Sequence, residues 1–119
     1  WFATGSILCG LGVILGAFGA HGLRERLTPE MLVVFETGVR YHLTHGLGLL
    51  AIAWAVSRWP DTYLNIAGYL FVAGILIFSG SLYVLAITGI RWLGAITPIG
   101  GVCLIVGWGL LVVGVLRAS

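Results

Sequence analysis

Long stretches without a charged residue are the feature that most constrains the fold of this chain. Four of them, at about residues 2–20, 41–57, 63–87 and 92–116, cover most of its 119 residues. A helix needs about 20 predominantly apolar residues to cross the hydrocarbon core of a bilayer, which is roughly 30 Å thick. The polar–apolar alternation of a transmembrane β-strand is missing from runs such as Leu82–Ile87. The sequence therefore predicts four transmembrane helices.

The composition excludes an ordinary soluble domain. Charged residues make up 8% of the chain and hydrophobic residues 60%, whereas a soluble domain carries roughly 25% charged residues. Its six arginines are too few and too scattered for a nucleic-acid-binding surface. Cys9 and Cys103 fall within apolar runs, where thiols behave as small hydrophobic groups. We therefore expect most of the surface to face lipid.

The only long connection, between the first two spans, contains a helix start. Thr28-Pro29-Glu30 combines an N-cap residue, a proline at the first helical position and an acidic first turn. We predict a short amphipathic interfacial helix at about residues 29–40, running into the second span. The expected fold is one all-α integral membrane domain over residues 1–119, with four helices in a compact Gly-rich bundle.

Small residues indicate where helices pack. Lipid does not drive apolar helices together, so they associate where small side chains let their backbones approach. Gly12, Gly16 and Ala20 lie four apart on the first span, and Pro98 is expected to bend the fourth helix because it has no N–H to donate. The residues predicted to pack between helices are Gly12, Gly16, Ala20, Gly80, Pro98 and Gly101.

Polar side chains gather toward one side of the predicted bundle. Four spans place both termini and the 57–62 turn on one side, and the 21–40 connection and the 88–91 turn on the other. The polar residues toward this second side, which we call the polar cap, are His21, Glu36, Arg40, Tyr41, His42, His45, Tyr83 and Thr97. Because a helix rises 1.5 Å per residue, His45 lies about 7 Å beyond Arg40, which predicts a shallow position in the membrane.

Ionisable groups inside a membrane usually turn inward and pair. We expect Glu36 to pair with Arg40, and the histidines to bond to Tyr83, Thr97 or backbone carbonyls. Two histidines three residues apart are a weak metal signal, so no metal site is predicted. Its candidate ligands, should one exist, are His21, His42 and His45. A proton relay through the histidines and Glu36 stays open.

No catalytic pattern is recognisable in the chain. It lacks an evident nucleophile–base pairing, a phosphate-binding loop and a dinucleotide fingerprint. We therefore expect a protein that is not an enzyme, and no cofactor is indicated.

Several motifs, in order along the chain, resemble one family. They are Gly16–Leu23, Phe35–His42, Phe78–Tyr83 and Leu93–Gly101. The chain resembles the YgdD and transmembrane-protein-256-like proteins, a domain of unknown function termed DUF423. The resemblance covers nearly the whole chain and implies a multi-pass protein, but it brings no reaction, substrate or cofactor. The family's motif residues at matching positions are His21, Glu36, Arg40, Tyr41, His45, Ser79, Tyr83 and Pro98.

These observations lead to three hypotheses about function. The first is an accessory or scaffold subunit, in contact with lipid and with the helices of a larger membrane complex or a homo-oligomer. The second is a small-ligand, metal or proton site at the polar cap. The third is a lipid- or quinone-binding module. We expect the bacterial inner membrane, with a mitochondrial membrane as the alternative.

Orientation follows from the arginines. Arg24, Arg26, Arg40 and Arg91 belong to the polar-cap side, against Arg58 and Arg117 on the other side. Because cytoplasmic loops carry an excess of Lys and Arg, the polar-cap side is predicted to face the cytoplasm.

Overall fold

Helices make up almost all of this protein, and no strand is present. A computed structural model describes residues 1–119. The α-helices are α1 (Phe2–His21), α2 (Pro29–Arg58), α3 (Thr62–Gly74), α4 (Gly80–Thr88) and α5 (Thr97–Ala118). A π-helical turn, Ile75–Ser79, joins α3 to α4, and a 3₁₀ segment, Arg91–Ala95, precedes α5. Short-range sequence signals set several ends, as the predicted Thr28 cap shows by accepting a hydrogen bond from the Met31 amide.

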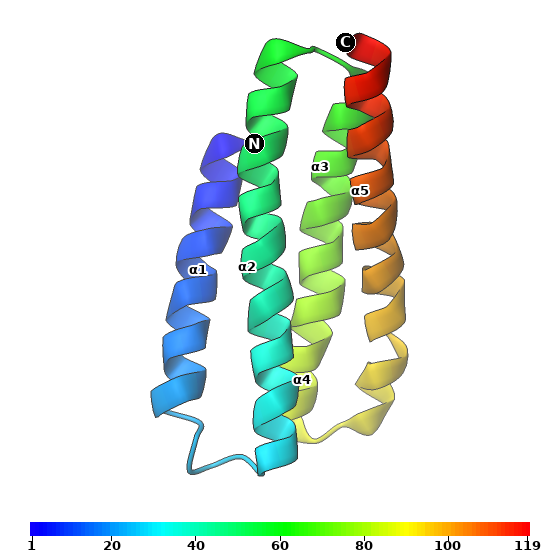
Figure 1. Cartoon of the computed structure of the whole chain (residues 1–119). Coiled ribbons are helices and arrows are strands. Elements are labelled where there is room, and N and C mark those ends of the chain that lie inside the picture. Colours follow the sequence, from blue (N-terminus) through cyan, green and yellow to red (C-terminus); the bar gives the residue numbers. More distant parts are fainter.

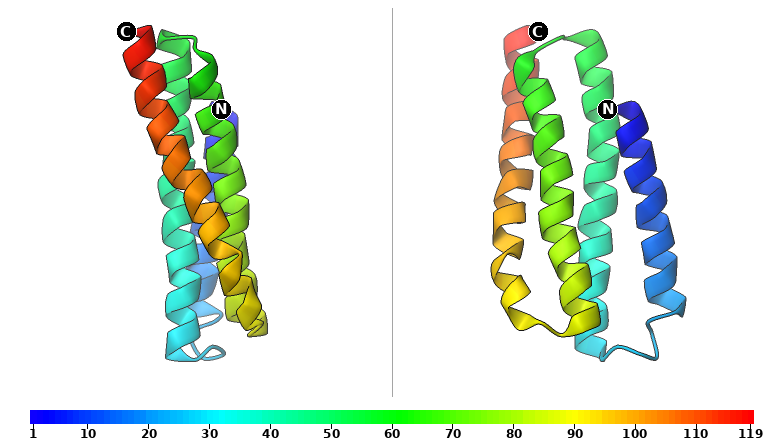
Figure 2. Two further views of the ribbon diagram at one scale, coloured as in Figure 1. Left: turned by 90° about the vertical axis from the view of Figure 1, so that its right-hand side faces the viewer. Right: turned by 180° about the vertical axis from the view of Figure 1, so that it is seen from behind.

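The helices form a flattened row rather than the compact bundle that the sequence suggested. Figure 1 shows the chain running down α1, up α2, down α3 and α4, and up α5. α1 packs chiefly on α2, α5 packs on α3, and α2 also contacts α3 and α4. The backbone extends over 50 × 26 × 15 Å, and the views in Figure 2 show how thin the row is. Both broad faces of the row are therefore open to the surroundings.

Three helical runs are long and apolar enough to cross a membrane. They are Phe2–His21, Thr62–Thr88 and Arg91–Ala118. α2 is not among them, because Glu30, Glu36 and Arg40 occupy its first half and two histidines its middle. The structure thus shows an all-helical protein with three runs that are long and apolar enough to span a bilayer.

The predicted interfacial helix is not a separate element. Residues 29–40 form the first part of a single, uninterrupted α2. Phe35 is fully buried there, with its ring 5.0 Å from that of Tyr83 on α4 and 6.5 Å from that of Phe18 on α1. The apolar stripe of this segment therefore packs on neighbouring helices, where we had expected it to rest on the membrane surface.

Glycines do let the helices approach closely, but the contact line on α1 differs from the predicted one. The buried glycines of α1 are seven residues apart: Gly5, Gly12 and Gly19. A Cβ added to Gly5 would lie 2.8 Å from the backbone oxygen of Gly46, so only glycine fits. Gly16 lies beside Val39 at the edge of this line, and Ala20 is exposed.

The other predicted packing residues do not lie at close contacts between helices. Gly80 has no neighbour where a Cβ would be, while Gly101 makes ordinary contact with the ring of Phe78. Pro98 is exposed in the first turn of α5, where a missing N–H needs no partner. The predicted irregularity is present, but it lies at Ile96, between the 3₁₀ segment and α5 and two residues before Pro98.

Candidate functional site

The two histidines of α2 lie midway along the helices. His42 packs against Gly12, at the centre of α1, and His45 bonds to Trp108, at the centre of α5. Both side chains are buried, with 4% of their surface exposed. The sequence suggested that His45 lies near one end of its span, whereas in the structure it lies near the middle of the helices. Because residues 29–40 are part of α2, the midpoint of this helix falls at the two histidines.

His45 is held in one tautomer. The Trp108 indole can only donate, and its Nε1–H donates to Nε2 of His45 over 3.0 Å. The proton of the imidazole must therefore be on Nδ1, which donates to the backbone oxygen of Tyr41 over 2.7 Å. The ring of Phe71 packs edge-on at 5.1 Å. Both nitrogens of His45 are thus occupied within the protein.

His42 belongs to a second set of contacts, between α2 and α4. Its Nδ1 and the Tyr83 hydroxyl share a hydrogen bond of 2.9 Å, while its buried Nε2 has no partner. One turn earlier, the Ser79 hydroxyl donates to the backbone oxygen of Gly38 over 2.7 Å. Hydrogen bonds between helices stabilise membrane bundles by about 1 kcal/mol each. We interpret this set as linking α2 to the π-helical turn and to α4.

The remaining polar-cap residues do not join these histidines. His21, Glu36 and Arg40 are exposed, and no ion pair joins Glu36 to Arg40. Two of the predicted histidine partners are confirmed, Tyr83 for His42 and a backbone carbonyl for His45, whereas Thr97 bonds to Ser81 over 2.6 Å. No group of three or more His, Cys, Asp or Glu side chains is placed to hold a metal ion. The predicted single cap is therefore divided among several separate contacts.

A groove opens beside His45 between α2 and α5. Its volume is about 550 Å³, in the range of small-molecule sites. The residues that line it are Arg40, Tyr41, Thr44, His45, Phe78, Gly101, Leu104, Ile105 and Trp108. Five of these have exposed side chains: Arg40, Tyr41, Thr44, Ile105 and Trp108. The groove is therefore open along the side of the helical row, where a membrane protein meets lipid.

The π-helical turn shapes one wall of this groove. Phe78 lies within the turn, with its ring 4.5 Å from the ring of Tyr41. Gly100 of α5 lies directly against the Phe78 backbone. Single π turns within α-helices are frequent at functional sites. This turn is the only such irregularity in the structure, and it falls at the groove.

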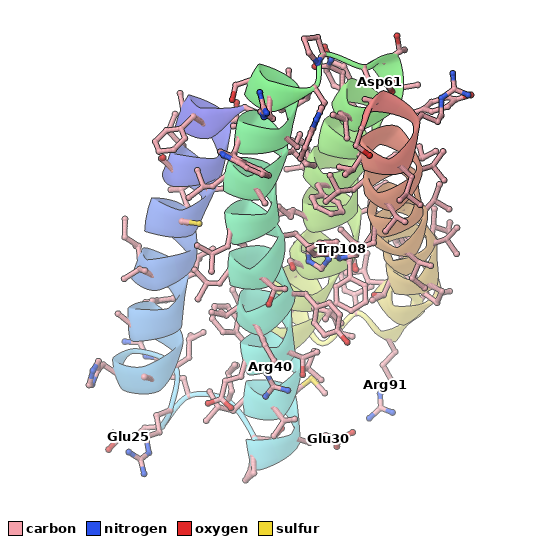
Figure 3. The ribbon with its side chains drawn as sticks, turned by 45° about the horizontal axis from the view of Figure 1, so that its top comes forward. Glu25, Glu30, Arg40, Asp61, Arg91 and Trp108 are labelled. Atoms are coloured by element: carbon pink, nitrogen blue, oxygen red, sulfur yellow. The ribbon has the colours of Figure 1, made fainter.

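Charge is confined to one end of the groove. Arg40 is its only charged residue, and no acidic side chain lines it. Figure 3 shows Arg40 toward the end of the molecule that carries Glu25, Glu30 and Arg91, with Trp108 nearer the middle and Asp61 at the opposite end. Leu104 and Ile105 line the groove on α5. A cationic end and an apolar body suit an amphipathic ligand.

Sequence reasoning placed three of the nine groove residues in the predicted polar cap. Arg40, Tyr41 and His45 were among the predicted polar-cap residues, whereas Phe78, Leu104, Ile105 and Trp108 were not singled out. Trp108 carried a usable signal, because tryptophan in membrane helices concentrates at the interfaces and this one lies mid-helix.

Comparisons with known proteins agree with the membrane assignment. Residues 15–101 match the family described as protein of unknown function DUF423. The chain is 50% identical to the UPF0382 membrane protein SSP2132 of Staphylococcus saprophyticus, over 95% of this chain and 93% of that protein. It is 46% identical to the UPF0382 membrane protein YwdK of Bacillus subtilis, with the same coverage. No solved structure matches the chain.

Proposed function

Since this chain belongs to the DUF423 family of membrane proteins, we propose that it is a four-span protein of the bacterial inner membrane that binds an amphipathic molecule from the bilayer. The groove between α2 and α5 carries this proposal, because it combines one cationic end, an apolar body and an open side. The role is binding rather than catalysis, since His45, the only imidazole of the groove, has both nitrogens engaged.

Several features support a fourth crossing by α2. With 30 residues it is about 45 Å long, more than a bilayer core requires. It lies alongside the three apolar runs, and its ends coincide with the two ends of the row (Figure 1). Its charged residues lie toward its two ends, with Glu30, Glu36 and Arg40 in the first half and Arg58 at the last position. The two histidines are buried and hydrogen-bonded. Buried polar groups with hydrogen bonds inside the protein, as His45 has at both nitrogens and His42 at one, are compatible with a membrane-spanning helix.

An accessory role in a larger complex is a second proposal. It is favoured by α1, which packs chiefly on α2 and exposes Ile7, Val13 and Ile14 on its outer side. A helix from another protein could pack there. Mild extraction followed by mass spectrometry of co-purifying proteins tests it, and recovery of a lone monomer would count against it.

Filling the groove is expected to abolish ligand retention. Thr44→Trp places a large side chain in the groove from the exposed side of α2. The protein is extracted under mild conditions, and native mass spectrometry records amphiphile-sized additions to its mass. We expect the original chain to retain such a molecule and Thr44→Trp to lose it.

A matched control separates the groove from the lipid-facing surface in general. Leu47→Trp adds a tryptophan to the same helix at an exposed position outside the groove. This variant should retain the amphiphile as the original chain does. Equal retention by both variants, or none by the original chain, would overturn the proposed binding function.

A further inference from the structure

We propose that the groove holds an anionic phospholipid, with its phosphate at Arg40 and one acyl chain along Leu104, Ile105 and Trp108. This inference rests on the proposed binding function and names its ligand class. Its first support is charge: the groove contains one cation and no acid, so it complements a negatively charged head. Arginine presents a planar fork of donors that matches the oxygens of a phosphate.

The polar groups near Arg40 are suited to such a head. Tyr41, whose side chain is 41% exposed and follows Arg40 in the chain, also lines the groove and carries a hydroxyl. Thr44 lies one turn further along α2, and its hydroxyl donates to the Arg40 backbone oxygen over 2.8 Å. Because the Thr44 hydroxyl donates its only proton to that carbonyl, it can only accept further hydrogen bonds. The hydrogen bonds to a phosphate would therefore be donated by Arg40 and Tyr41.

The middle of the groove argues against a quinone or another ligand with a polar ring. Such a ring would need hydrogen-bond donors at mid-depth. The polar hydrogens there, on Trp108 Nε1 and His45 Nδ1, are both donated within the protein. The surfaces left over belong to Leu104, Ile105 and the indole ring. They are suited to an acyl chain, which makes only apolar contacts.

The arginine distribution places the charged end of the groove in an appropriate leaflet. Arg91 lies toward the same end of the molecule as Arg40 and Glu25 (Figure 3), and Arg24 and Arg26 flank Glu25 in the chain. The positive-inside rule therefore assigns that end to the cytoplasm. The cytoplasmic leaflet is the one that carries a negative surface potential, and basic pockets between helices on that side bind anionic head groups. Burial against a phosphate also offsets the cost of an arginine near the hydrocarbon.

A competition between two lipids tests this assignment. The full chain in detergent is given an equimolar mixture of phosphatidylglycerol, which is anionic, and phosphatidylcholine, which has no net charge. Native mass spectrometry then counts the bound lipids. We expect phosphatidylglycerol to bind in several-fold excess, because the quaternary ammonium of phosphatidylcholine opposes the attraction between its phosphate and Arg40. Arg40→Gln should remove the preference while phosphatidylcholine still binds.

Three controls keep the outcomes distinct. Arg40→Lys should keep part of the preference, and Arg58→Gln, at the opposite end, should keep all of it. Equal binding of both lipids by the original chain would overturn the assignment of an anionic lipid and leave the groove's binding function standing, whereas binding of neither lipid would overturn both. An undiminished preference in Arg40→Gln would show that Arg40 does not hold the head group. Because Arg40 is exposed, its variants are expected to fold, which their thermal midpoints would verify.

Discussion

Gly100→Ala is expected to lower the free energy of unfolding by about 1–3 kcal/mol, the usual cost of overpacking. The added Cβ would run into the backbone nitrogen and Cα of Phe78 in the π-helical turn. A backbone cannot rotate away as a side chain can, so α5 and the turn would have to separate. Because Phe78 lines the groove, ligand retention should fall with stability.

The next residue provides the control for this prediction. A Cβ on Gly101 would lie 3.7 Å from the Phe78 ring, an ordinary van der Waals contact. Gly101→Ala should therefore be neutral or slightly stabilising, since alanine favours the helix over glycine by about 1 kcal/mol. Unfolding of the purified protein by increasing SDS in mixed micelles measures both variants. If the two variants unfold at the same SDS fraction, α5 does not approach the π-helical turn as closely as described.

Breaking the hydrogen bond between Trp108 and His45 is expected to cost about 1–2 kcal/mol. Trp108→Phe leaves Nε2 of His45 without its donor, and His45→Leu leaves the indole N–H without its acceptor. An unpaired polar group is costly among apolar side chains in the middle of the row. Each single variant should therefore unfold at a lower SDS fraction than the original chain.

The double variant separates the hydrogen bond from packing. In the variant that carries both Trp108→Phe and His45→Leu, no polar group is left unpaired. Its loss of unfolding free energy should therefore be smaller than the sum of the losses in the two single variants. Trp54→Phe serves as the control, because Trp54 is 63% exposed and packs its ring on Trp59. Strictly additive losses would show that the bond contributes nothing measurable.

Apolar run length predicted where the helices other than α2 lie. Phe2–His21 and Thr62–Thr88 match the first and third predicted spans within about a residue, and Thr28 caps its helix as expected. What the sequence did not reveal is which side of each helix faces its neighbours. On α1 nearly every residue is apolar or small, so polarity cannot separate the Gly5–Gly12–Gly19 line from the Gly12–Gly16–Ala20 line.

The groove depends on features that no local pattern encodes. The π-helical turn packs against α3, α4 and α5, which are distant or separate elements that a local pattern does not describe. Gly74 and Gly80 flank the turn, but glycine is frequent in membrane helices and so gives no specific signal. The pairing of His45 with Trp108 joins residues 63 positions apart. Sequence reasoning could list the polar residues of α2, but only the packed helices show that His45 turns inward while Arg40 remains at the open side.

Crossing of the membrane by α2 is the claim on which the mid-depth histidines and the side-opening groove both depend. Topology reporters fused before Trp1 and after Ser119 test it directly. Four crossings place both termini on the same side, as their common end of the row in Figure 1 requires. The positive-inside assignment makes that side the outer one. Reporters on the same, non-cytoplasmic side are the predicted result, and reporters on opposite sides would contradict the account.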